Sequence, residues 1–304
     1  MREESAGKPS SFASRDPSFA ERVTERVQHA KQVGALHVTR TQAHVVEDQG
    51  VPFLVHQALE KRHKPHGKRF DPRTQSDPFE RHDPHLFVED ISTTHKVLLN
   101  KYPVLDNHLL LVTKKFEHQQ SWLTVADFEA IARTVERMDA LIFYNGGPVA
   151  GASQPHKHIQ ALPLPLGHQD SPVPLWPGDT RERDDSSWTG TVSSWPFLHL
   201  AVRMPGEAHE VGPQELLRQA TEAMNSLELL DRHSGLPAPF NLVIVRNWMW
   251  IVPRVEERVG KISINGLGFV GSFYVKNQRR LSRLRATGPM KALELVTGSR
   301  AFEE

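Results

Sequence analysis

The stretch Asn145-Gly-Gly-Pro-Val-Ala-Gly-Ala-Ser-Gln-Pro-His-Lys-His-Ile-Gln160 decides the fold of this chain. Its first half is rich in glycine, which adopts backbone angles that side chains forbid and lets N–H groups approach an anion closely. In its second half His156, His158 and Gln160 are spaced by two, so on a β-strand they share one face while Lys157 points to the other. The stretch therefore predicts an anion-binding loop followed by a strand that presents two imidazoles and a carboxamide.

The histidine row suggests nucleophilic chemistry. An unprotonated imidazole attacks readily near neutral pH, and attack by His158 on the α-phosphorus of a nucleotide would give a nucleotidyl-histidine. The second ring nitrogen of His158 then needs an acceptor, such as a backbone carbonyl, and His156 would buttress that arrangement. Gln160 can donate a hydrogen bond to a phosphoryl oxygen but cannot deliver a proton. We therefore expect transfer to a good nucleophile such as phosphate, with a phosphate leaving group.

Two other interpretations of the same spacing stay open. A His-x-His pair on a strand also has the spacing of metal ligands. It equally fits polar residues on the wet face of an antiparallel sheet. The glycine loop and Ser153-Gln154 directly upstream favour phosphate chemistry over both.

The quoted stretch resembles the signature of the ATP adenylyltransferases, also called diadenosine tetraphosphate phosphorylases. This family is a branch of the histidine-triad superfamily and is related to the galactose-1-phosphate uridylyltransferases. The resemblance implies that His158, with His156 and Gln160, is catalytic and that His158 carries the adenylyl group. It also implies substrate or phosphate contacts from Asn145, Gly151, Ala152, Ser153 and Gln154.

Two further segments are similar to the family. Asn100-Lys-Tyr-Pro and the His108-Leu-Leu-Leu-Val-Thr run resemble a segment whose asparagine and lysine lie close to the nucleotide, which implies roles for Asn100 and Lys101. The alternative is a hairpin whose polar tip only faces water. The run 262–272 resembles a segment that packs near the nucleotide pocket, and its glycines within a strand-like pattern indicate bulges or close backbone approach. Second-rank site candidates are His108, Asn265 and Lys276.

The resemblance implies phosphorolysis of diadenosine tetraphosphate to ATP and ADP, and the reverse reaction. The alternatives are a hydrolase that splits the same dinucleotides with water, a non-catalytic nucleotide-binding module, and a metal-dependent His-x-His enzyme. Gln160 argues against the hydrolase, and an intact His158 argues against the binding module. A divalent cation such as Mg²⁺ is expected to arrive with the polyphosphate, without a protein-caged metal.

The overall composition narrows the function further. The 304 residues contain 37 Lys and Arg against 36 Asp and Glu, which leaves no excess charge for binding nucleic acid. No apolar run is long enough for a membrane span, and the first residues lack an apolar signal core. Cysteine is absent, which excludes disulfides and thiolate metal sites and favours a cytoplasmic location. The oligomeric state stays open.

The order of elements predicts an α+β fold in which an antiparallel sheet has helices packed on one face and two halves loosely echo one another. The family resemblance implies that this sheet is histidine-triad-like. We expect a disordered N-terminus at 1–15, a catalytic half at 16–165, a proline-rich linker at 166–195, a C-terminal half at 196–290 that completes the nucleotide pocket, and a terminal helix and tail at 291–304. A basic loop at 61–85 is expected to be solvated or to reach the polyphosphate.

Overall fold

The computed structural model describes residues 17–60, 77–166, 171–177, 188–231, 233 and 235–298. The predicted disordered N-terminus, most of the basic loop and parts of the predicted linker lie outside these residues. Within them, no helix is both long and apolar enough to cross a membrane.

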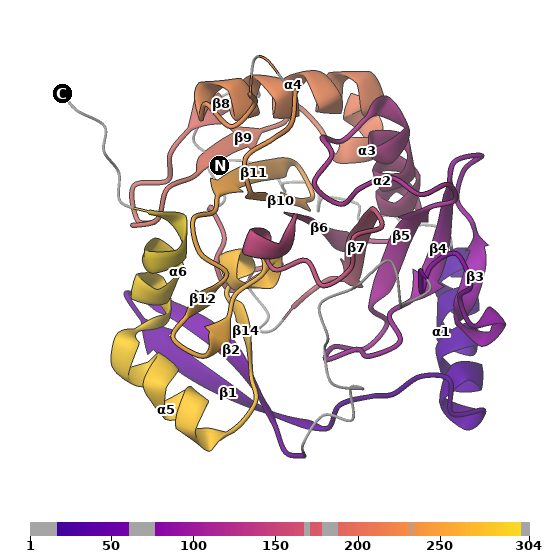
Figure 1. Cartoon of the computed structure of the whole chain (residues 1–304), viewed down its shortest axis with the longest axis horizontal. Coiled ribbons are helices and arrows are strands. Elements are labelled where there is room, and N and C mark those ends of the chain that lie inside the picture. The colour runs from indigo at the N-terminus through magenta and orange to yellow at the C-terminus, as the bar shows by residue number, and fades with distance from the viewer. Residues whose placement is uncertain are drawn as a thin grey trace, which may run out of the picture.

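A large sheet forms the middle layer of the described part of the chain (Figure 1). Its strands follow the order β3-β4-β5-β7-β6-β10-β11-β9-β8, and every neighbouring pair is antiparallel. The strands are β3 (Phe87–Asp90), β4 (His95–Leu99), β5 (Leu109–Thr113), β6 (Ala140–Gly146), β7 (His158–Pro163), β8 (Trp188–Gly190), β9 (Leu200–Arg203), β10 (Phe240–Val245) and β11 (Trp248–Pro253). The two halves of the chain meet where β6 pairs with β10, so both contribute to one continuous sheet.

Helices cover one face of this sheet. They are α1 (Pro17–Gln32), α2 (Val125–Arg137), α3 (Ala208–Val211) and α4 (Pro213–Ser226). On α1 the apolar residues Phe19, Val23, Val27 and Ala30 recur at helical spacing and are all buried. The sequence Thr124-x-x-Asp127 forms a capping box, because the Thr124 side chain and the Asp127 side chain each bind the other residue's backbone N–H at the start of α2.

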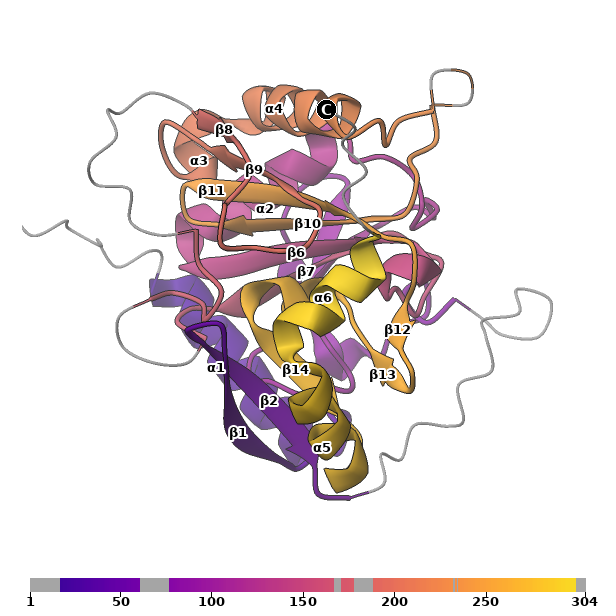
Figure 2. The same ribbon diagram turned by 90° about the vertical axis from the view of Figure 1, so that its left-hand side faces the viewer.

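A second layer covers the opposite face, as Figure 2 shows below the large sheet. It consists of a small sheet in the order β1-β2-β14 and two helices. The elements are β1 (Thr41–Asp48), β2 (Val51–Ala58), β14 (Ser272–Val275), α5 (Gln278–Thr287) and α6 (Pro289–Thr297). Their apolar side chains share a core with Leu141, Phe143 and Leu162 of the large sheet. The predicted helical layer is therefore present on one face of the large sheet, and the other face is covered by this additional layer, which includes the helices α5 and α6.

Three local predictions need correction. The predicted linker contains β8, which pairs with β9 at the edge of the large sheet. The glycine run 262–272 is not mainly extended, since Gly266–Val270 forms the 3-10 turn η3 between the short strand β13 (Ile262–Ser263) and β14; β13 pairs with β12 (Arg258–Val259). The histidine stretch enters its strand only at His158, and His156 lies before it in an isolated bridge with His118.

Candidate active site

His158 is the first residue of β7, and its surroundings keep its ring neutral. The Nδ1–H group donates to the backbone carbonyl of His156 over 2.9 Å, which leaves the lone pair on Nε2. Burial lowers the pKa of His158 from 6.5 to about 4; the bond to the His156 carbonyl opposes this shift and the charge of the His156 ring adds to it. The structure thus supplies the backbone acceptor that the sequence argument required, and the ring is a free base at neutral pH.

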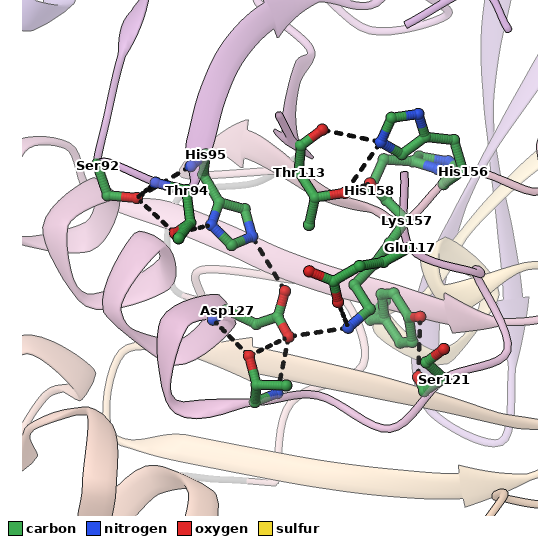
Figure 3. A network of polar contacts seen from close by, with 12 residues as sticks. Ser92, Thr94, His95, Thr113, Glu117, Ser121, Asp127, His156, Lys157 and His158 are labelled. Carbon is green, nitrogen blue, oxygen red and sulfur yellow. Dashed lines mark hydrogen bonds and ion pairs between the residues drawn. The ribbon is translucent and has the colours of Figure 1, made fainter. Parts of the chain in front are cut away.

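His156 holds His158 through its carbonyl, while its own ring is engaged elsewhere. Its Nδ1 lies 2.5 Å from the Asp77 carboxylate, and its Nε2 lies 2.8 Å from the carbonyl of Thr113 and 2.9 Å from the hydroxyl of the same residue. Figure 3 shows the contacts with Thr113. Both ring nitrogens of His156 are therefore engaged by neighbouring groups, which fixes the orientation of the ring. The contact predicted from the sequence is therefore present, in that the backbone of His156 holds Nδ1 of His158.

Gln160 is oriented by a chain of hydrogen bonds from the β4–β5 turn. Asn100 Nδ2 donates to His108 Nδ1 over 3.2 Å, and His108 Nε2 donates to Gln160 Oε1 over 2.9 Å. The Asn100 Oδ1 atom accepts the backbone N–H of Tyr102, which orients the first amide. Since Oε1 of Gln160 takes this bond, the amide nitrogen is the end left for a phosphoryl oxygen. Of the predicted site residues, His108 thus contacts Gln160 directly, and Asn100 is connected to Gln160 through His108. Asn100 and His108 also line a small cavity next to α1.

Asn145 lies at the end of β6 and is held by the C-terminal half of the chain. Its Oδ1 accepts Asn241 Nδ2 over 2.8 Å and the backbone N–H of Gly266 over 2.9 Å. Asn241 is in turn oriented by the buried guanidinium of Arg254, which donates to Asn241 Oδ1 over 2.6 Å. The Nδ2 group of Asn145 is buried without a partner among the described residues. It is a donor that a nucleotide oxygen would satisfy.

The sequence predicts a glycine loop whose N–H groups bind an anion, but in the structure two of these N–H groups already have backbone partners. Residues 148–150 form the 3-10 turn η2, and the N–H groups of Gly151 and Ala152 donate to the carbonyls of Pro148 and Gly147. Gly151 has φ of +95°, and a Cβ there would lie 2.7 Å from the Cβ of Asn265, so only glycine fits. The loop therefore packs against η3, and Asn265 acts as its packing partner. Ser153 is exposed.

Lys157 points away from the histidines into a buried polar network on the other side of the strand (Figure 3). Its Nζ donates to Glu117 Oε2 over 2.6 Å and to Asp127 Oδ2 over 3.1 Å. Asp127 also accepts His95 Nε2 over 3.0 Å. Burial raises the pKa of Asp127, but the hydrogen bond from His95 and the charge of Lys157 outweigh it and hold this pKa below its usual value. The network ties the nucleophile's strand to α2 and β4.

Phe79 covers the catalytic histidines in this structure. Its ring centroid lies 5.1 Å from that of His158 and 5.7 Å from that of His156. Lys96 Nζ holds the segment by donating to the Phe79 carbonyl over 2.7 Å. His158 is only 5% exposed.

The remaining predicted residues lie further from His158. Lys101 and Gln154 are half-buried, and Lys276 is exposed just beyond β14; none of the hydrogen bonds described around His158 involves them. Sequence reasoning missed Gln119, Asn241 and Arg254, each of which bonds to a site residue or to its partner. Gln119 sits in a polar loop and the other two in or beside apolar strands, so no motif marks them.

No group of three or more His, Cys, Asp or Glu side chains in the described ranges is arranged to hold a metal ion. The donor set around His158 instead consists of imidazoles and amides that already bond to one another.

Comparisons with known proteins agree with this geometry. The family model described as the Ap4A phosphorylase N-terminal domain matches residues 10–178, and that of the ATP adenylyltransferase C-terminal domain matches residues 193–298. Diadenosine 5',5'''-P1,P4-tetraphosphate phosphorylase 2 of Saccharomyces cerevisiae is 26% identical over 310 residues, which cover 88% of this chain and 90% of that protein. Protein APA1 of the same yeast is 28% identical over 212 residues, which cover 62% and 64%.

The crystal structure of yeast Ap4A phosphorylase Apa2 matches with a TM-score of 0.76 at 22% identity, over 94% of this chain and 99% of that one. Its complex with Ap4A matches with a TM-score of 0.72 at 23% identity, over 94% and 98%. Family models, fold and relatives together define a nucleotidyltransferase, in which the buried, neutral His158 begins a strand of the large antiparallel sheet. The first family model spans more than half of the 304 residues, and the chain belongs to the Ap4A phosphorylase family.

Proposed function

We propose that this protein is a diadenosine tetraphosphate phosphorylase that works through an adenylyl-His158 intermediate. The observation that carries the proposal is the state of His158. Its Nδ1–H is committed to the His156 carbonyl, and burial lowers its pKa to about 4, so Nε2 offers a lone pair at neutral pH. A residue that only binds a nucleotide has no need of a free nucleophilic nitrogen.

The reaction has two steps. In the first, Nε2 of His158 attacks the α-phosphorus of the dinucleotide, a bond from that phosphorus to nitrogen forms, and the bond to the bridging oxygen breaks to release ATP. In the second, an oxygen of inorganic phosphate attacks the same phosphorus, the bond to nitrogen breaks, and ADP leaves while the phosphate loses its proton to solvent. The first displacement forms adenylyl-His158 and the second restores neutral His158. Both displacements are reversible, so the reaction also runs in reverse.

Gln160 and Asn145 supply donors for the phosphoryl and nucleotide oxygens. The relay from Asn100 through His108 occupies Oε1 of Gln160, and Asn241 with Gly266 occupies Oδ1 of Asn145. Each amide therefore has its nitrogen left to donate, and such preoriented donors stabilise charge that develops on the transferring group. Neither amide can protonate a leaving group or deprotonate water, which favours phosphate over water as acceptor.

Structures of a relative support the proposal for the ligands of this chain. Yeast Apa2 has been crystallised with AMP and with Ap4A. We infer that this chain takes diadenosine tetraphosphate, ATP, ADP and phosphate, and that Mg²⁺ or a similar ion enters with the polyphosphate and neutralises part of its charge. Cytoplasmic location stays a prediction.

Product analysis tests the proposal. The protein is incubated with diadenosine tetraphosphate with and without phosphate, and the nucleotides are separated by chromatography. We expect repeated turnover to equal amounts of ATP and ADP only when phosphate is present; without phosphate, at most one ATP per protein molecule should form. His158→Ala should reduce turnover by at least about a thousandfold, whereas the exposed His233→Ala serves as a control with near-normal turnover. AMP as the main product without phosphate would show a hydrolase, and normal turnover by His158→Ala would refute the nucleophile.

A further inference from the structure

The pairing of β6 with β7 stops just before the nucleophile. The two strands are paired from Ala140 opposite Pro163 to Phe143 opposite Gln160. Continued by two residues, this register would set Asn145 opposite His158. On its other side β7 remains paired with β5 as far as Val112 opposite His158. The sheet therefore opens on one side only, between the residue that attacks and the amide that offers a donor to the nucleotide.

The side chain of Gln119 fills this opening. Its Oε1 accepts the backbone N–H of His158 over 2.8 Å. Its Nε2 donates to the backbone carbonyls of His158, over 3.2 Å, and Asn145, over 2.9 Å. The carboxamide thus replaces the peptide group that a neighbouring strand would offer, and it binds both strands at once.

Gln119 is itself held in place. It is 1% exposed, and its backbone N–H donates to the carbonyl of Pro155 over 2.6 Å. The buried hydroxyl of Tyr144 donates to the backbone carbonyl of Gln119 over 2.5 Å. The adjacent bridge between His118 and His156 adds a third attachment. With its backbone anchored on both strands, the Gln119 amide can set their separation.

We propose that Gln119 is a positioning residue for adenylyl transfer, which sets the distance from the backbone of His158 to that of Asn145 and so aims Nε2 at the bound α-phosphate. This rests on the proposed function. A shift of about an ångström in the reacting atoms lowers a rate by about a hundredfold without weakening binding. Loss of the amide should therefore slow formation of the adenylyl-enzyme more than it weakens dinucleotide affinity.

Two substitutions separate this role from simple filling of space. Gln119→Glu keeps the length and the acceptor for the His158 N–H but loses both donors. Gln119→Met keeps the approximate length and loses every polar contact. The neighbouring exposed residue provides the matched control, Gln120→Met. For each variant we measure three quantities. The first is the single-turnover rate of adenylylation after mixing with dinucleotide in the absence of phosphate, and the others are the dinucleotide Kd and the thermal unfolding midpoint.

We expect adenylylation to fall at least about tenfold per folded molecule in both Gln119 variants, with Kd within about threefold of wild type and Gln120→Met unchanged. The carboxyl group that Gln119→Glu introduces regains a donor when protonated, so the rate of this variant relative to wild type should rise as the pH falls from 8 to 5.5. His118, His156 and His158 are present in the Gln119→Met variant as well, which should show no such rise.

Rates within twofold of wild type, or losses that only follow the folded fraction, would refute the positioning role. An equal loss in Kd would refute it as well, since Gln119 would then act on binding. Wild-type protein that forms no adenylyl-enzyme would instead refute the proposed function, so the two failures are distinguishable.

Discussion

Replacing Lys157 by methionine is the most direct perturbation of the network behind the nucleophile. The Lys157 side chain is 1% exposed, and its ammonium lies 3.1 Å from the carboxylate of Asp127, which is itself fully buried. At an effective dielectric constant of about 20, a pair at this distance attracts with about 5 kcal/mol before desolvation. Breaking a buried pair by removing one partner typically costs about 3–5 kcal/mol, because the remaining charge is left uncompensated.

We therefore expect Lys157→Met to lower the free energy of unfolding by about 3–5 kcal/mol, or the unfolding midpoint by about 6–10 °C at about 2 °C per kcal/mol. The surface pair of Lys114 and Asp90 gives the control, since Lys114→Met should cost less than about 1 kcal/mol. Urea unfolding followed by circular dichroism measures both. The double variant Lys157→Met/Asp127→Asn no longer carries the Asp127 charge that has lost its Lys157 partner. We therefore expect about 1–3 kcal/mol of the lost free energy of unfolding to be recovered, which is the size of coupling between contacting groups.

The pH dependence has a definite sign. The pKa of Asp127 is held below its usual 3.8, so its contribution to stability is present above that value and is lost as the pH falls through the folded-state pKa. Lys157→Met also removes the charge that helps to lower this pKa, so the pKa of Asp127 in the variant should lie above that of wild type, and the deficit should shrink as the pH falls through the variant's pKa. The reasoning would be refuted if Lys157→Met lowered the free energy of unfolding by less than about 1 kcal/mol at pH 7. It would also be refuted if the losses of the single variants Lys157→Met and Asp127→Asn added up to that of the double variant within about 0.5 kcal/mol.

Three further predictions concern the reaction. Gln160→His introduces a group that can exchange protons, so the ratio of hydrolysis to phosphorolysis should rise; an unchanged product ratio would remove the argument that Gln160 disfavours water. The pKa of His158 is lowered to about 4, so the single-turnover adenylylation rate should not fall through protonation of this ring between pH 8 and 5.5, whereas a limb near pH 6.5 that belongs to His158 would contradict the burial argument. Asn241→Leu frees the Asn145 amide to rotate, so KM for the dinucleotide should rise about tenfold, a loss of about 1.4 kcal/mol, with a smaller effect on kcat.

Many of the helices and strands can be predicted from the sequence because the patterns that indicate them are local. The stripe of α1, the capping box at Thr124 and the short apolar runs of β4 and β5 each depend on neighbours within a few residues. The spacing of His158 and Gln160 places them on one strand face, and the need for an acceptor at Nδ1 follows from imidazole chemistry alone. The family resemblance supplied the reaction.

The missing parts depend on contacts between segments far apart in the chain. Gln119 meets His158 across 39 positions and Asn241 meets Asn145 across 96, and neither residue carries a local pattern. The N–H groups of the glycine loop are turned inward because the loop packs against η3, which arrives from the C-terminal half. The strand β8 has three residues, too few for a periodicity to show.

The central claim is that His158 becomes covalently adenylylated, and intact-protein mass spectrometry tests it directly. The protein is incubated with diadenosine tetraphosphate in the absence of phosphate, and phosphate is then added. The account predicts a mass gain of one adenylyl group that maps to His158, is absent in His158→Ala, and disappears on adding phosphate as ADP is released. Phosphate-dependent production of ADP without any adduct on His158, or an adduct on another residue, would contradict it.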